Sequence, residues 1–210
     1  SVGGGTITAA EDSDHSHNFY AVRVDKGALD INMKDGAAGD TTTKITGDMY
    51  ATGQYGKKVV EYTGGELIDW NDAGILNVAL TDKDSFWKGD VSNANGSNAG
   101  IVNLYMGSGA SWTGNNLSGN TVNANLDNAT WTGYSNGNAM HLKLDNSIWH
   151  VNGASKIASF SGNKGSIFVA SDAGDISVGD YSGNATVIYN HDADHPTNIL
   201  GGNFTIGQAK

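Results

Sequence analysis

Two short polar stretches of this 210-residue chain gather side chains that can bind metal ions. The residues of ligand type are Asp12, Asp14, His15 and His17 in the first stretch and His191, Asp192, Asp194 and His195 in the second. Imidazole and carboxylate groups together suit zinc, copper or nickel. Neither spacing matches a zinc finger or a metalloprotease. We therefore interpret both stretches as solvated loops, and the sequence predicts neither a metal site nor a cofactor.

A serine nucleophile is the second chemistry to consider. Ser182 lies in the string Gly179-Asp180-Tyr181-Ser182-Gly183, which differs by an inserted tyrosine from the Gly-Asp-Ser-Gly phrase of chymotrypsin-like proteases. An active serine also needs a positioned base and an orienting carboxylate, and the sequence shows no evident partner for Ser182. We interpret Ser182 as a corner residue.

A pair of carboxylates that could hydrolyse a glycosidic bond is the third chemistry to consider. Glycoside hydrolases need two of them across one groove, about 5 to 9.5 Å apart. Asp127 and Asp145 could meet, since each begins an Asp-Asn turn after a leucine, but the repeat described next explains both positions. Polysaccharide lyases add a basic group, yet Arg23 is isolated and Lys143 sits inside a repeat strand. The sequence therefore predicts that the protein is not an enzyme and identifies no catalytic residue.

The chain is organised around one short phrase that occurs four times between residues 76 and 153. Each copy begins with alternating apolar residues, crosses a small polar turn and ends at a tryptophan. The copies read LNVALTDKDSFW, VNLYMGSGASW, VNANLDNATW and MHLKLDNSIW, and they end at Trp87, Trp112, Trp131 and Trp149. The intervals between these tryptophans are 25, 19 and 18 residues, and the first three tryptophans are followed by any residue and then glycine.

This repeat predicts an all-β fold. A period near 20 residues marks a solenoid, in which each unit buries its apolar face against its neighbours. Apolar residues at every second position, such as Leu76, Val78 and Leu80, indicate strands. Stacking such units gives parallel strands about 4.8 Å apart, which is a parallel β-helix. Equivalent residues would then lie above one another, so we expect an inward ladder of tryptophans rather than an exposed sugar-binding row.

Composition agrees with this fold. The chain has 30 glycines, one proline and no cysteine, and glycine and asparagine both tolerate the positive φ of sharp corners. The length allows about ten stacked turns and gives no reason to divide residues 1–210 into two domains. The clear repeats run from residue 75 to residue 190. The lack of cysteine excludes disulfide-stapled folds and zinc sites of the cysteine type.

Charge excludes several partners. The formal net charge is -10, and Arg23 is the only arginine. A nucleic-acid binder needs a basic stripe, which this chain lacks, and an anionic membrane surface would repel it. No apolar run approaches the roughly 18 residues that span a bilayer.

The stretch SIWHVNGASKIASFSGNKGSIFVAS and the following GDYSGNATVIYN resemble a known family. They are similar to the late passenger region of monomeric (type V) autotransporters of the AIDA, antigen 43 and pertactin-like group. Passengers of this group carry a small residue, Trp, any residue and Val, then Asn or Gly, then Ser-x-Val. The matching positions here are Ser147, Trp149, Val151, Asn152, Gly153, Ser155 and Ile157.

The resemblance implies a right-handed parallel β-helix, exported by a Gram-negative bacterium through a C-terminal translocator β-barrel. The chain would be a piece of a longer protein, with its barrel-proximal part around residues 156–210, displayed at the bacterial cell surface or secreted. The implied role is that of a non-enzymatic adhesin. It would attach to a host surface receptor or glycan, or associate with another passenger in biofilm formation. A structural stalk for a distal binding domain and a polysaccharide-active enzyme remain the alternatives.

Overall fold

The computed structural model describes residues 1–9, 20–59, 67–92, 100–137, 139–164, 166–169, 174–188 and 204–209. All regular structure within these ranges is β-strand, so the all-β prediction is confirmed. No helix that is long and apolar enough to cross a membrane occurs in the described part of the chain.

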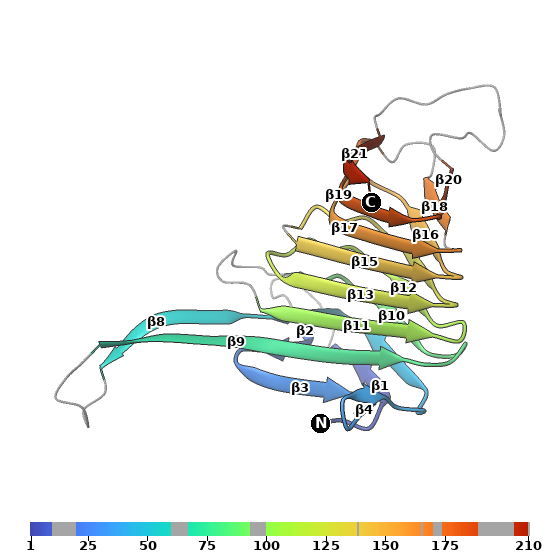
Figure 1. The fold of residues 1–210 in the computed structure, drawn as a ribbon. Coiled ribbons are helices and arrows are strands. Elements are labelled where there is room, and N and C mark those ends of the chain that lie inside the picture. Colours follow the sequence, from blue (N-terminus) through green and yellow to red (C-terminus); the bar gives the residue numbers. More distant parts are fainter. Residues whose placement is uncertain are drawn as a thin grey trace, which may run out of the picture.

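Two parallel sheets contain most of the described strands (Figure 1). The first, here called the long sheet, consists of β3 (Gly27–Ile31), β9 (Leu67–Leu80), β11 (Ile101–Gly107), β13 (Thr121–Asp127), β15 (Ala139–Asp145), β17 (Ser155–Asn163), β19 (Ile176–Gly183) and β21 (Phe204–Ala209). The second, the short sheet, consists of β1 (Gly5–Thr8), β6 (Thr43–Thr46), β10 (Phe86–Lys88), β12 (Ser111–Thr113), β14 (Thr130–Thr132), β16 (Ile148–Val151), β18 (Ser166–Val169) and β20 (Thr186–Ile188).

From β9 onward the chain alternates between the two sheets. We call one strand of the long sheet and the next strand of the short sheet a unit. Successive units pair in register, as in Val102 with Val122 and then Met140. A third column of paired residues consists of isolated β-bridges that join Met49, Val91, Asn116 and Ser135. At the N-terminal end of this column, β2 (Tyr20–Val24) pairs with β7 (Asp48–Ala51). Each unit therefore rests on the one before it.

Two strand pairs depart from this parallel arrangement. β4 (Met33–Lys34) and β5 (Ala37–Ala38) form a small antiparallel pair. β8 (Gly53–Val59) runs antiparallel to the first half of β9, and the two strands project from the side of the stack (Figure 1). The repeat in the sequence does not predict this pairing. The chain between residues 53 and 73 is longer than one crossing between sheets requires, and its two arms pair with each other instead.

The core is a ladder of tryptophans, as predicted. Trp87, Trp112, Trp131 and Trp149 are fully buried and occupy equivalent positions of neighbouring short-sheet strands. Their ring centroids lie 4.7, 4.8 and 4.9 Å apart, with the planes within 7° of parallel. Aliphatic rows from the long sheet, such as Leu104, Ala124 and Leu142, face them across the interior. Stacked rings add stability beyond their buried area.

The glycine that follows each of the first three tryptophans is explained by a second ladder. Each indole Nε1 donates a hydrogen bond, at 2.9 to 3.0 Å, to the carbonyl oxygen of the glycine that follows the preceding strand of the short sheet. The pairs are Trp87 with Gly47, Trp112 with Gly89, Trp131 with Gly114 and Trp149 with Gly133. A Cβ on Gly114 would lie 1.8 Å from the oxygen of Gly89. The close approach of these backbones therefore requires glycine.

The corners after the long-sheet strands use left-handed backbone. Asn128 has φ 55° and Asn146 has φ 46°, and Ser108 and Lys164 occupy the same corner with φ 52° and 59°. Asparagine tolerates this region better than most residues. The prediction that the Asp-Asn pairs mark corners is confirmed.

Candidate binding groove on the long sheet

The outer face of the long sheet carries two rows of side chains that run across the strands. The first row is formed by Asp30, Asn77, Asn103, Asn123, His141, Ser159 and Asp180, which are paired in register from β3 to β19. The second row, two residues further along each strand, is formed by Tyr105, Asn125, Lys143, Ser161 and Ser182. The strand register thus aligns residues from distant units into two parallel lines.

Hydrogen bonds join the members of the first row. Asn77 Nδ2 donates to Asp30 Oδ1 at 2.7 Å, and Asn103 Nδ2 donates to Asn77 Oδ1 at 2.8 Å. Asn123 Nδ2 donates in turn to Asn103 Oδ1 at 2.8 Å. An amide has two N–H donors and two lone pairs on its oxygen. The amides of Asn77 and Asn103 each use one donor and one lone pair in this chain, which leaves one of each for a ligand.

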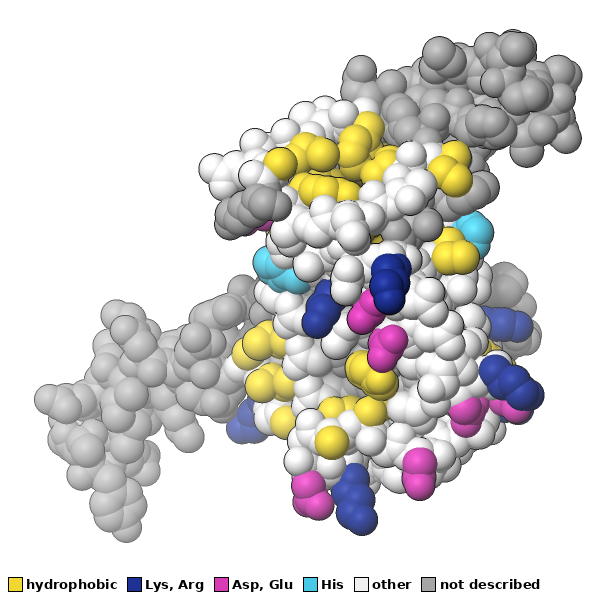
Figure 2. All heavy atoms as spheres, turned by 45° about the vertical axis from the view of Figure 1, so that its right-hand side comes forward, with side chains coloured by type: hydrophobic (Ala, Val, Ile, Leu, Met, Phe, Trp, Pro, Cys, Tyr) yellow, Lys and Arg dark blue, Asp and Glu magenta, His cyan; other side chains and the backbone are white. Residues whose placement is uncertain are grey.

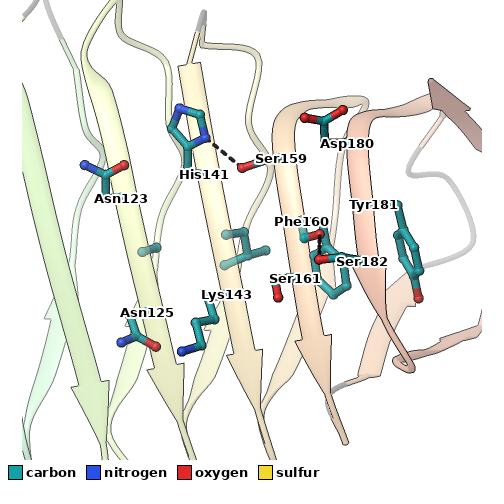
Figure 3. Close-up of a pocket in the computed structure, with 12 residues that line it drawn as sticks. Asn123, Asn125, His141, Lys143, Ser159, Phe160, Ser161, Asp180, Tyr181 and Ser182 are labelled. Carbon is teal, nitrogen blue, oxygen red and sulfur yellow. Dashed lines mark hydrogen bonds between the residues drawn. The ribbon is translucent and has the colours of Figure 1, made fainter. Parts of the chain in front are cut away.

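Two hollows lie between the rows and share Asn123 and Asn125. One has a volume of about 220 Å³ and is lined by Met33, Asn77, Asn103 and Tyr105. The other, of about 380 Å³, is lined by His141, Lys143, Ser159, Ser161, Asp180, Tyr181 and Ser182 (Figure 3). Because the hollows share residues, they adjoin each other, and we call the two together the groove. It runs along the stacking direction rather than along the strands.

Tyr105 presents an aromatic ring to this groove. A Cβ built on Gly107 would lie 3.0 Å from the Oη of Tyr105 and 3.3 Å from its Cζ. The ring therefore rests over the glycine two residues later on the same strand. The missing side chain at residue 107 is what lets the ring lie along the sheet.

The groove is nearly neutral in charge. Lys143 is exposed, and it forms no ion pair with any carboxylate of the described residues. Asp30 and Asp180 stand toward the two ends of the first row. On the face seen in Figure 2, basic side chains stand among acidic ones, and those described there form no continuous basic stripe.

The metal-binding chemistry considered from the sequence falls outside the described residues. The first stretch, around His15 and His17, and the second, around His191 and His195, both belong to the ranges without a description. Within the described ranges, no three His, Cys, Asp or Glu side chains gather as a metal site would require.

Ser182 lies within strand β19 and not at a corner, so that part of the prediction was wrong. Its Oγ donates to the carbonyl oxygen of Phe160 at 3.4 Å, and it lines the groove from the second row. Gly179 lies within the same strand, and a Cβ there would lie 2.5 Å from the oxygen of Ala158. That glycine permits close strand packing rather than a turn.

A different serine approaches a histidine. The Nδ1 atom of His141 and the Oγ atom of Ser159 lie 2.7 Å apart. In a catalytic triad the carboxylate lies on the far side of the imidazole. Here the next residue beyond His141 in the row is Asn123, while Asp180 stands beside Ser159. The row order therefore lacks the arrangement that activates a serine.

Asp127 and Asp145 are register partners at the ends of β13 and β15, as the repeat predicts. Both residues lie outside the lining of the groove. Arg23 pairs with Asp25 at 2.6 Å and lies 5.6 Å from the centroid of the Tyr50 ring. Lys143, expected inside a repeat strand, is on β15 and points into the groove (Figure 3).

The groove residues were not identified from the sequence, although a signal was present. Asn123 precedes Trp131 by eight residues, and His141 precedes Trp149 by eight (131 − 123 and 149 − 141). Asn103 precedes Trp112 by nine. Nearly equal offsets from a stacked tryptophan place these residues in one row, and their alternation with buried neighbours on the same strand places them on the outer face.

Comparison of the chain with protein-family models, with curated proteins and with solved structures finds no match in any of the three. The groove and the repeat that builds it are therefore the features of the molecule that bear on its function.

Proposed function

We propose that this chain is a passenger region of a type V autotransporter of the AIDA, antigen 43 and pertactin-like group. In this proposal its units wind into a right-handed parallel β-helix that forms a single domain. Two features support it: the alternation of the chain between two parallel sheets, and the phrase around Trp149, whose indole closes the tryptophan ladder.

The function proposed is that of a non-enzymatic adhesin, displayed at the bacterial cell surface or secreted. It would attach to a host receptor or glycan, or associate with a second passenger in biofilm formation. The observation that carries this proposal is the groove, in which polar side chains recur from strand to strand about every 4.8 Å. Each hydrogen bond contributes only about 0.5–1.5 kcal/mol net. Affinity would come from the number of contacts along the groove and from multivalency.

A polysaccharide-active enzyme is less well supported by the same geometry. The His141–Ser159 pair has Asn123, and not a carboxylate, as the next residue on the imidazole side. The register pair Asp127 and Asp145 stands apart from the groove lining. Binding without turnover is therefore the activity that we propose.

A structural stalk is the second candidate. Unbroken in-register pairing of the long sheet from β3 to β21 and the closely stacked tryptophans favour it. A rod of this kind would hold a distal domain away from the cell surface without a ligand of its own.

The test is to display the 210-residue chain on bacteria through a translocator barrel and to measure attachment and cell aggregation across a salt series. Cells that display an unrelated passenger serve as the control. An adhesin gives attachment or aggregation, and self-association should be weaker at low salt because the net charge is -10. Efficient display with neither effect favours the stalk. Release of new reducing ends from a polysaccharide would overturn the non-enzymatic assignment.

A further inference from the structure

We infer that the groove on the long sheet binds a linear, uncharged polysaccharide whose chain lies along the stacking direction. This inference rests on the proposed binding function and specifies the ligand class. It follows from the periodicity, the hydrogen-bonding groups and the charge of the described groove residues.

The first argument for a linear polymer is the regular spacing of the groove residues along the stack. The lining residues are presented one unit after another, so polar side chains recur at the strand spacing of about 4.8 Å. An extended β-1,4-linked chain likewise places one pyranose ring after another along its axis, with alternate rings turned over. A ligand with a short axial repeat can therefore meet equivalent groups on successive strands. Asn77, Asn103 and Asn123 provide three such positions in one row.

The hydrogen-bonding groups are those that suit hydroxyls. The ladder fixes the orientation of each amide, so less side-chain entropy is lost when a ligand binds. The spare donor and acceptor of each ladder amide can both be used by a sugar hydroxyl, which is itself donor and acceptor. Asn125 adds another amide from the second row. Tyr105, whose ring lies over Gly107, offers a face for the C–H groups of a pyranose.

Charge favours an uncharged chain. The groove contains one lysine, Lys143, and the whole protein carries a net charge of -10. Asp180 lines the groove, and Asp30 ends the amide ladder. A polyanion laid along the groove would meet these carboxylates and the general field of the protein. A neutral polymer meets no such penalty, and its binding is insensitive to salt.

Affinity electrophoresis of the purified 210-residue chain tests this. Native gels would contain hydroxyethyl cellulose or glucomannan as neutral probes and alginate as an acidic one. The expected result is retardation by at least one neutral probe, unchanged when the salt concentration is raised. Retardation by alginate alone that disappears with salt would overturn the inference, as would no retardation by any probe.

Variants locate the site. The double variant Asn103→Ala/Asn123→Ala should weaken binding about tenfold, since it removes two ladder amides, and Tyr105→Ala should weaken it to a similar extent. The matched control is Thr113→Ala/Thr132→Ala, a register pair on the outer side of the short sheet, which should bind normally. Unchanged emission of the buried tryptophans shows that each variant is folded. Equal losses in the two double variants would contradict the groove assignment.

The adhesin proposal and the inference of a neutral polysaccharide ligand can be tested separately. If displayed cells attach or aggregate but no neutral polysaccharide retards the protein, the adhesin proposal stands and this inference fails. If neither effect occurs, both fail.

Discussion

The indole Nε1 of Trp131 donates a 2.9 Å hydrogen bond to the carbonyl oxygen of Gly114, which belongs to the preceding unit. Both residues take part in the stack in a second way. Trp131 lies between the rings of Trp112 and Trp149, and the N–H of Gly114 donates to Thr132 of the next unit at 3.0 Å. Each unit therefore satisfies buried polar groups of its neighbour while it fills the core.

Replacement of Gly114 by alanine tests the backbone part of this relationship. Gly114 has φ 154°, and an added Cβ would lie 1.8 Å from the oxygen of Gly89. We expect the free energy of unfolding to fall by about 1–3 kcal/mol, as for other overpacked sites. Urea unfolding followed by tryptophan emission measures it. Gly3→Ala, where nothing lies within 4 Å of the added Cβ, is the matched control and should be neutral.

Trp131→Phe separates the hydrogen bond from the stacked ring. The phenyl ring keeps the stack but leaves the carbonyl oxygen of Gly114 without its indole donor. A buried polar group that loses its partner costs about 1–3 kcal/mol. Trp131→Ala should cost about 3–5 kcal/mol, because it also leaves a cavity. A phenylalanine variant as stable as the wild type in urea would show that the indole N–H contributes nothing.

Corner geometry is tested at Asn128, whose φ is 55°. Alanine has no polar side chain and disfavours left-handed backbone by about 1–2 kcal/mol, so Asn128→Ala should lower the unfolding free energy by about that amount. Asn128→Gly should have a much smaller effect, because glycine adopts this conformation freely. Thermal unfolding of the two variants, compared side by side, gives the answer. Equal losses for alanine and glycine would assign the role to the side chain of Asn128.

Asp90 should make stability depend on pH. Burial, and secondly the neighbouring Asp48, raise its pKa above the ordinary value of 3.8, although the backbone N–H of Asn115 donates to it at 2.7 Å. With a raised pKa in the folded state, the stability that Asp90 provides is complete below pH 3.8 and is lost as pH rises through the folded value. Stability at pH 7 is therefore reduced by this charge.

The substitution Asp90→Asn keeps the hydrogen-bond acceptor and removes the charge. We expect a gain of no more than about 1 kcal/mol at pH 7, because Asp90 is partly exposed and solvent screens its charge. The gain should vanish at pH 3, where Asp90 of the wild type is also neutral. Thermal unfolding at the two pH values measures it, with the exposed Asp40→Asn as the control. A gain of equal size at both pH values would contradict the charge explanation.

Much of the core could be predicted from the sequence, because the repeat encodes it locally. The spacing of Trp112, Trp131 and Trp149 specifies the period, and alternation around Val122 and Leu126 specifies which side chains face inward. The Asp-Asn phrases specify corners through the φ preference of asparagine. Each of these signals lies within one unit and needs no knowledge of a partner strand.

The groove could not be derived in the same way. It depends on which residues of different units become neighbours, and the pairing of His141 with Ser159, 18 residues later, follows from strand register. The antiparallel pairing of β8 with β9 depends likewise on partner choice. Gly179 shows a further limit of prediction from the sequence, because glycine in a strand and glycine in a turn look alike there.

The most direct test of the account is attachment by cells that display the wild-type chain, the groove variant Asn103→Ala/Asn123→Ala or the control variant Thr113→Ala/Thr132→Ala at matched surface levels. If the groove is the binding surface, wild-type and control cells attach or aggregate equally, and cells with the groove variant lose most of this activity. Equal activity of all three would contradict the account, because binding would then reside elsewhere on the molecule.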